Sequence, residues 1–215
     1  MNKEKEIQKK RYDQAQGPRS KREFDITSHK VRRLLKGKIL DAGGGTGQIT
    51  YGLDSTVLDI SKKSLEKARA HGLKTVVGDI ENMPFESNTF DTVLLCHVLE
   101  HVLEPEKTLK ECKRVLKKNG RVVIVVPNAR AIHQLWLLLK GRVKPAGNPP
   151  GEFHHYTQFT DKTLRKTVSK YFKVTRVEGD VLTFPGMHAL KLYRLGSILA
   201  SSKWANNIIL VGQVK

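Results

Sequence analysis

Cysteine, acidic residues and long apolar runs are all scarce in this chain of 215 residues. The two cysteines, Cys96 and Cys112, lie within otherwise regular apolar or helical stretches, which suits a reducing compartment and excludes a disulfide scaffold. No stretch reaches the roughly 18 uncharged apolar residues that a membrane-spanning helix needs. The N-terminus is charged and lacks the apolar core of a signal peptide. We therefore expect a cytoplasmic protein without a transmembrane segment, whose contact with a membrane, if it has one, is peripheral.

The shortage of acidic residues leaves a net charge of +18, and this charge is unevenly placed along the chain. Residues 1–37 carry +7, residues 38–128 carry +1 and residues 129–215 carry +10. A basic surface attracts anions, so RNA, an anionic membrane surface and an anionic small molecule are candidate partners of the flanks. A surface whose charges only keep the protein in solution explains the same numbers equally well.

Short apolar runs alternate with helical patterns along the chain. Strands are expected at residues 38–42, 56–60, 74–77, 92–96, 121–126, 174–177 and 208–214. Helices are expected at residues 21–36, 62–71, 106–117, from 160 or 161 to about 171, and at 187–201. Near-continuous apolar strands of this kind indicate a parallel sheet covered by helices on both faces. The sequence thus predicts one Rossmann-like α/β domain with a seven-stranded, mostly parallel sheet. We place a flexible, basic N-terminus at 1–20, the domain at 21–215, its core at 37–128, and a variable cap and the last strands at 129–215.

The most specific motif is a glycine-rich loop, Asp41-Ala-Gly43-Gly44-Gly45-Thr46-Gly47, directly after the first strand. Glycines let the backbone turn tightly and approach a ligand, and ligands of open α/β sheets bind at the carboxyl ends of the strands. Gln48 stands where a dinucleotide fingerprint needs Gly or Ala, and no Lys-Ser/Thr pair follows as in a phosphate-binding P-loop. The carboxylate of Asp41 suits a cationic amino-acid group, such as that of S-adenosylmethionine (SAM), and repels a pyrophosphate.

The loop resembles motif I of the class I SAM-dependent methyltransferases. The resemblance continues in register over about residues 37–128, where it is similar to the ubiquinone/menaquinone-biosynthesis type of small-molecule methyltransferase. The matching segments are Gly78-Asp79-Ile80, Pro84-Phe85, Phe90-Asp91, Val98-Leu99-Glu100-His101-Val102 and the stretch from Arg114 to Gly120. The resemblance implies SAM as the cofactor, with Asp59 at the ribose hydroxyls and Gly78-Asp79-Ile80 near the adenine. The implied cofactor-binding residues are Asp41, Gly43, Gly45, Gly47, Asp59, Ile60, Asp79, Ile80 and His97. Because only Gln48–Asp54 separate the loop from the second strand, we also expect an unusually short first helix.

Four histidines are candidate catalytic residues: His97, His101, His154 and His155. His97 ends the fourth strand, close to where the methyl group should lie, and the last two follow a loop rich in Gly and Pro. The order His97-x-x-Glu100-His101, with a distant histidine, resembles the metal site of small-RNA 2′-O-methyltransferases and some quinone O-methyltransferases. Two or three imidazoles with one carboxylate would favour a transition metal over Mg²⁺. A Glu-His pair that orders the turn without a metal is the more common arrangement, so the sequence leaves the metal undecided.

The nature of the acceptor is the least determined feature. The Asn/Asp-Pro-Pro-aromatic motif of amino-methylating DNA enzymes is absent after the fourth strand, and Cys96 lacks the preceding proline of RNA cytosine-C5 enzymes, so we interpret it as a core residue. Segments near 135–144 and 187–201 combine apolar and basic residues, a pattern found at lipid interfaces, around apolar substrates and in ordinary lid helices. We therefore predict methyl transfer to a small-molecule or lipid-like acceptor, anionic acceptors included. An RNA methyltransferase is the second hypothesis, and a SAM-binding protein without turnover that acts through a partner is the third. Nothing in the sequence indicates the oligomeric state.

Overall fold

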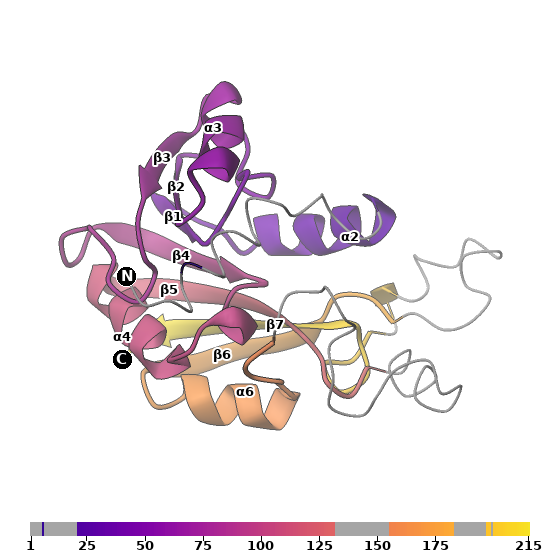
Figure 1. The fold of residues 1–215 in the computed structure, drawn as a ribbon. Helices are drawn as coiled ribbons and strands as arrows, with labels where there is room; N and C mark the ends of the chain where they lie inside the picture. Colours follow the sequence, from indigo (N-terminus) through magenta and orange to yellow (C-terminus); the bar gives the residue numbers. More distant parts are fainter. Residues whose placement is uncertain (1–5, 7–20, 132–154, 183–196, 199) are drawn as a thin grey trace.

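A single sheet of seven strands organises the computed structural model, which describes residues 21–131, 155–182, 197–198 and 200–215, together with residue 6. The strands are β1 (Ile39–Ala42), β2 (Ser55–Asp59), β3 (Lys74–Val77), β4 (Phe90–Cys96), β5 (Leu116–Pro127), β6 (Phe172–Gly179) and β7 (Asn207–Val214). Their order is β3-β2-β1-β4-β5-β7-β6; the pairs from β3 to β5 are parallel, and β7 is antiparallel to both of its neighbours (Figure 1). The predicted seven-stranded, mostly parallel sheet is confirmed.

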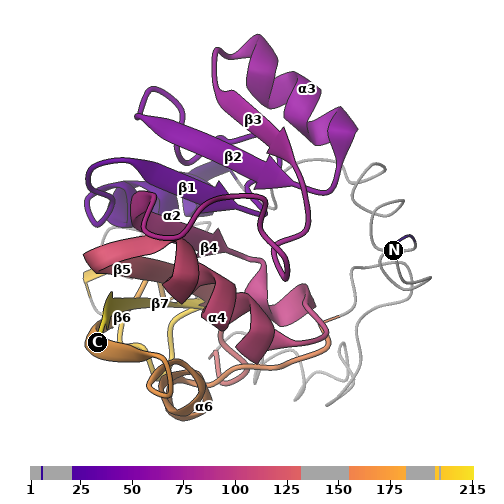
Figure 2. The same ribbon diagram turned by 90° about the vertical axis from the view of Figure 1, so that its left-hand side faces the viewer.

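Helices cover both faces of this sheet, as predicted. They are α2 (Lys21–Arg32), α3 (Lys62–Ala70), α4 (Pro105–Val115) and α6 (Asp161–Val168), with a single 3₁₀ turn, η1 (Leu99–His101), after β4. On one face, α4 and α6 bury Leu109 and Leu164 in the larger apolar core. On the other face, α2 buries Val31 against Leu94 and Val123 of the sheet. Figures 1 and 2 show α2 and α6 on opposite sides of the strands.

The boundaries of some elements differ from those predicted. The helix expected at 106–117 ends at Val115, and β5 begins at once with Leu116, which pairs with Phe90. This pairing with a distant strand decides the boundary, because it outweighs the local helical pattern. The basic N-terminus expected at 1–20, apart from residue 6, and most of the helix expected at 187–201 lie outside the described residues. Within the described part of the chain, no helix is long and apolar enough to cross a membrane.

The short first helix that we expected between the glycine loop and β2 is replaced by two successive turns. They are closed by hydrogen bonds from Thr50 N to Gly47 O (3.1 Å) and from Leu53 N to Thr50 O (3.0 Å). Because Ser55 is in register with Ile39, the chain must run back along all of β1, about 13 Å at 3.3 Å per residue. The seven residues 48–54 would span only about 10 Å as a helix. The connection is therefore too short to contain one.

The helix α2 packs on this face of the sheet and contacts the turns directly. One guanidinium nitrogen of Arg32 donates hydrogen bonds to the carbonyl oxygens of Ile49 (2.7 Å) and Tyr51 (2.9 Å). Leu34 and Leu35, just beyond α2, join the same apolar cluster as Ile49. The covering of this face thus comes from a segment that precedes β1.

A buried carboxylate connects α2 to the far end of the sheet. Asp180 is fully buried after β6, and it accepts hydrogen bonds from the Thr27 hydroxyl (2.7 Å), the Val181 N–H (2.5 Å) and both the main chain and side chain of Asn207 (2.9 and 2.5 Å). The ammonium of Lys30 donates to the carbonyl oxygens of Gly179 and Asp180 (3.0 and 2.7 Å), and burial lowers its pKa. α2 and the C-terminal strands are therefore held together by polar as well as apolar contacts.

Replacing Asp180 with alanine is expected to lower the free energy of unfolding by about 3–5 kcal/mol, because several buried donors would lose their acceptor. Urea unfolding followed by circular dichroism measures this change. Asp25→Ala is the matched control, since it removes the same charge from an exposed position on α2. A loss for Asp180→Ala no larger than that of Asp25→Ala would contradict the structural role given to this carboxylate.

Candidate active site

The glycine loop after β1 owes its shape to three glycines in the left-handed region. Gly43, Gly45 and Gly47 have φ angles of +75°, +55° and +72°, which L-residues with side chains rarely adopt. The loop is fastened by hydrogen bonds from Gly43 N to Leu58 O (2.7 Å) and from Gly47 N to Gly44 O (2.9 Å). The alternating glycines of the sequence motif therefore correspond to alternating left-handed residues in the loop.

Asp41 lies beneath this loop rather than in front of it. Its carboxylate is buried and accepts a hydrogen bond from the Thr50 hydroxyl (2.8 Å), and a Cβ added to Gly44 would stand only 2.4 Å from it. Burial raises the pKa of Asp41 to about 6, the Thr50 hydrogen bond lowers it in part, and the nearby negative charge of Asp59 raises it further. In this structure Asp41 supports the loop from behind, and its contact with a cofactor ammonium group stays a prediction.

Asp59, at the end of β2, holds the front of the same loop. One carboxylate oxygen accepts from Gly45 N (2.8 Å) and the other accepts from Ser61 N (2.8 Å), at the start of α3. A Cβ on Gly45 would meet only the Asp59 carboxylate, at 3.9 Å, so the space in front of Gly45 is open. The loop and the carboxylate together form one wall of a cavity.

This cavity is an open cleft at the carboxyl ends of β1, β2, β3 and β4. Its lining residues are Gly43, Asp59, Ile60, Gly78, Asp79, Ile80, Glu81, His97, Val98, His101, Val102 and Leu103. Although the whole chain carries +18, the described lining contains three carboxylates and no Lys or Arg. Such a cleft suits a cationic ligand and disfavours a pyrophosphate.

Most of the predicted cofactor residues line this cleft. They are Gly43, Asp59, Ile60, Asp79, Ile80 and His97; Asp41, Gly45 and Gly47 belong to the adjoining loop and do not appear in the lining. The structure adds Glu81, which is buried and accepts a hydrogen bond from Glu104 N (3.2 Å), and two apolar residues, Val102 and Leu103. One signal in the sequence pointed to Glu81. An aspartate often turns the chain by accepting the backbone N–H two residues further on. Asp79 accepts the N–H of Glu81 in this way (2.9 Å).

His97 and His101 lie in the lining on either side of Glu100. His97 has a φ of +55°, an uncommon conformation for a residue with a side chain, and its N–H donates to Val125 O (2.9 Å). Its Nδ1 lies 3.4 Å from Oε1 of Glu100, and Nε2 of His101 lies 3.8 Å from the same oxygen. The end of β4 thus presents two imidazoles next to one buried carboxylate.

The structure brings His155 to the same place, while His154 lies outside the described residues. The rings of His101 and His155 meet edge to face, with centroids 4.8 Å apart. The segment that follows His155 is fastened in two ways: Thr157 N donates to Glu100 O (3.3 Å), and Ala129 N donates to Phe159 O (2.9 Å). A residue far from the loop in sequence therefore packs against His101, which lines the cleft.

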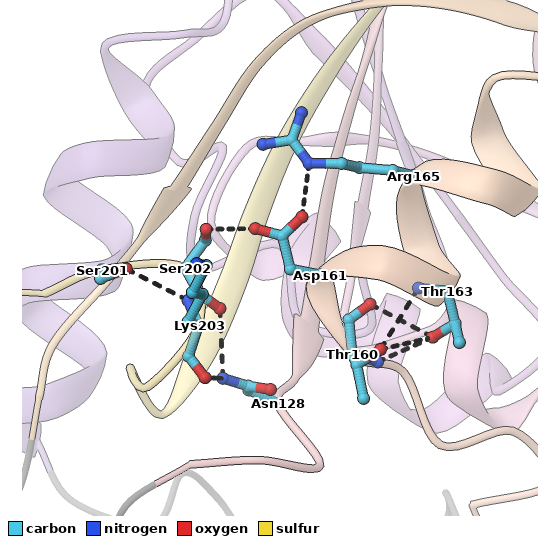
Figure 3. Close-up of polar contacts among 8 residues, drawn as sticks. All are labelled: Asn128, Thr160, Asp161, Thr163, Arg165, Ser201, Ser202 and Lys203. Carbon is cyan, nitrogen blue, oxygen red and sulfur yellow. Dashed lines mark hydrogen bonds and ion pairs between the residues drawn. The ribbon is translucent and has the colours of Figure 1, made fainter.

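The start of α6 anchors this segment further (Figure 3). Thr160 and Thr163 form a capping box, in which each side chain accepts the other's backbone N–H. Asp161 contacts both Arg165 and Ser202, and the side-chain amide of Asn128 donates to the carbonyl oxygens of Ser202 (3.2 Å) and Lys203 (3.1 Å). The end of β5, the start of α6 and the turn before β7 are thus joined by one set of polar contacts.

The two cysteines do not contribute a reactive thiol to the cleft. Cys96 packs against the apolar cluster under α2, and burial raises the pKa of its thiol well above the ordinary value. Burial raises the pKa of Cys112 in the same way. Neither thiol is a nucleophile near neutral pH, in agreement with the interpretation of Cys96 as a core residue.

Comparison with known proteins decides what kind of domain carries this cleft. Residues 40–124, which include the glycine loop, Asp59 and the histidines after β4, match the family model of the methyltransferase domain. Over residues 40–124 this chain is therefore similar to the class I SAM-dependent methyltransferases. Its cofactor is SAM, and the lining agrees with that, because three carboxylates face a ligand that carries a sulfonium and an ammonium group.

Relatives of the methyltransferase domain include enzymes named for quinone-type substrates. The chain is 29% identical over 168 residues to the demethylmenaquinone methyltransferase of Thermotoga maritima, which covers 68% of this chain and 71% of that protein. It is 28% identical over 162 residues to the 2-methyl-6-phytyl-1,4-hydroquinone methyltransferase 1 of Oryza sativa, covering 67% and 48% of the two chains. For several curated relatives, this one included, the match spans about half of their length.

The fold of the methyltransferase domain also occurs among solved structures. The crystal structure of a SAM-dependent methyltransferase from Thermotoga maritima superposes with a TM-score of 0.71 at 21% identity, covering 90% of this chain and 94% of that one. At this identity the likeness establishes the shared fold. The Rossmann-like class predicted from the sequence is confirmed by it.

Proposed function

We propose that this protein transfers the methyl group of SAM to a small, lipid-like acceptor of the hydroquinone type. The observation that carries the proposal is the composition of the cleft, where carboxylates gather near the glycine loop and apolar residues lie beside the histidines at the end of β4. Leu103 in the lining is 39% exposed, so its side chain is accessible to an apolar ligand in the cleft. The printed names of the two relatives above, a menaquinone and a phytyl-hydroquinone enzyme, support an acceptor of this class.

The residues of this chain divide into those that hold the cofactor and those that face the acceptor. The loop from Gly43 to Gly47 and the Asp59 carboxylate would hold the adenosine and amino-acid parts of SAM. Bound there, SAM would supply a methyl group that is activated by its sulfonium leaving group. Val98, Val102 and Leu103 exclude water from the transfer site. The residues of the cleft would raise the rate mainly by aligning the acceptor with the methyl group, because the methyl group needs no further activation.

His97 is the candidate base for an acceptor whose nucleophile must lose a proton. Its ring is 41% exposed in the lining, and Nδ1 lies 3.4 Å from the buried Glu100 carboxylate. A protonated His97 would form an ion pair with that carboxylate after it takes up the proton. A positioned base of this kind contributes typically about 10²–10⁴-fold to a rate.

An assay with SAM labelled in its methyl group tests the acceptor class. The purified full-length chain is incubated with a phytylated or prenylated hydroquinone, a lipid extract, total RNA and a fraction of water-soluble metabolites. We expect label in the hydroquinone and lipid samples. Label in RNA alone would favour the second hypothesis, an RNA methyltransferase, which is consistent with the basic flanks. SAM binding without label in any sample would favour a SAM-binding protein that acts through a partner.

A further inference from the structure

Glu100 is a buried carboxylate whose two oxygens accept no hydrogen bond from the described part of the chain. Its side chain is 2% exposed, and no described residue donates a hydrogen bond to either of its oxygens. Burying a carboxylate without donors is unfavourable, so native proteins pair such groups or use them to bind cations. The closest groups of the cleft wall, His97 and His101, meet it with ring nitrogens at 3.4 and 3.8 Å, beyond good hydrogen-bond geometry.

Three donors converge on this point from two segments of the chain. A carboxylate oxygen of Glu100 and one ring nitrogen each of His101 and His155 all lie within 4.8 Å of one another. Glu100 and His101 belong to η1, whereas His155 comes from the segment before α6. The hydrogen bond from Thr157 N to the carbonyl oxygen of Glu100 (3.3 Å) holds these two segments together, so the convergence does not depend on the side chains alone.

From this geometry we propose that Glu100, His101 and His155 bind a divalent transition-metal ion. Two imidazoles and one carboxylate match the ligand types of zinc and related ions, whereas Mg²⁺ and Ca²⁺ prefer all-oxygen sites. A set of two histidines and one glutamate leaves a fourth position open, which is the arrangement of catalytic rather than structural zinc sites. The ion would also neutralise the buried Glu100 carboxylate.

The position of the site gives the ion a role in the cleft. His101 lines the cleft directly and His97 lies 3.4 Å from the shared carboxylate oxygen, so the open position would face the side where the acceptor is expected. A metal there would lower the pKa of a bound acceptor hydroxyl and orient it. This role rests on the proposed function, whereas the metal site itself stands on the three donors.

Calorimetric titration of Zn²⁺ into the chelator-treated, tag-free full-length chain tests the site without cofactor or acceptor. We expect one equivalent to bind, and Co²⁺ in its place to give the visible absorption of a four- or five-coordinate site. His155→Ala and Glu100→Gln should each weaken binding by at least about tenfold, as loss of metal-site partners typically does. His71→Ala is the matched control, because His71 is exposed at the end of α3 and remote in sequence from the donors.

The outcomes separate this proposal from the proposed function. One site lost in both donor variants and kept in His71→Ala supports the metal centre, whatever the methyl-transfer assay gives. Absence of stoichiometric Zn²⁺ binding, or binding that the donor variants leave unchanged, overturns it, and methyl transfer can still be observed in that case. Should Glu100→Gln fail to fold by circular dichroism, His155→Ala decides, since its ring is only partly buried.

Discussion

Replacing Asp59 with alanine is expected to raise the dissociation constant for S-adenosylhomocysteine by about 10- to 150-fold. A hydrogen bond to a charged group contributes about 1.5–3 kcal/mol, and each 1.4 kcal/mol corresponds to a factor of ten. Asp59 lines the cleft and also accepts the N–H of Gly45, so its loss removes a ligand contact and loosens the glycine loop at once. Calorimetric titration measures the affinity directly.

Asp54→Ala is the matched control for this experiment. Asp54 precedes β2, its side chain is exposed, and its removal changes the charge of the chain by the same amount. NAD serves as a second control ligand and should not bind to either protein, because its pyrophosphate would face a cleft lined by carboxylates. Equal affinities for S-adenosylhomocysteine in the two variants would contradict the assignment of the cleft as the cofactor site.

Asp41→Asn is expected to stabilise the ligand-free protein at neutral pH and to have little effect in acid. Because the folded-state pKa of Asp41 is about 6 and its ordinary value is 3.8, the folded state holds the proton more tightly than the unfolded chain does. The stability of the wild type therefore includes a contribution from this group that is fully present below about pH 4 and is lost as the pH rises to 6. At 1.36 kcal/mol per pKa unit, the buried charge costs the fold about 3 kcal/mol at pH 7.

Urea unfolding of both proteins at pH 4, 5, 6 and 8 measures this difference. The side-chain amide that replaces the Asp41 carboxylate keeps an acceptor for the Thr50 hydroxyl, so the gain should grow from pH 4 to pH 6 and then stay constant. A difference that does not change with pH would contradict the raised pKa. The same variant tests the cofactor role of Asp41, since a fall in S-adenosylhomocysteine affinity as large as that of Asp59→Ala would indicate contact with the ligand.

The sequence predicted the sheet well because each strand is a separate apolar run that ends in a distinctive residue. Asp41, Asp59 and His97 follow or end three such runs, so their meeting at one edge of a parallel sheet could be foreseen. Two features depended on contacts between distant segments. The early start of β5 follows from pairing of Leu116 with Phe90, and the missing first helix follows from the register of Ser55 with Ile39.

The acceptor side of the cleft could not be predicted as well from the sequence, because it also depends on contacts between distant segments. His155 reaches His101 through contacts between distant segments, such as the hydrogen bond from Thr157 N to Glu100 O, more than fifty residues away along the chain. Val102 and Leu103 belong to an irregular segment after η1, whose path no local pattern specifies. The unpartnered state of the Glu100 oxygens among the described residues is a property of packing and could not be read from residue types.

The placement of α2 has a consequence for how the chain folds during its synthesis. Thr27 of α2 bonds to Asp180, 153 positions later, and the apolar cluster under α2 includes Ile209 and Val211 of the last strand. At about 5–20 residues per second, a ribosome needs about 8–30 s to add the residues between Thr27 and Asp180. α2 can pack on β4 and β5 once they are made, but its contacts with Asp180 and with Ile209 and Val211 of β7 form only at the end of synthesis.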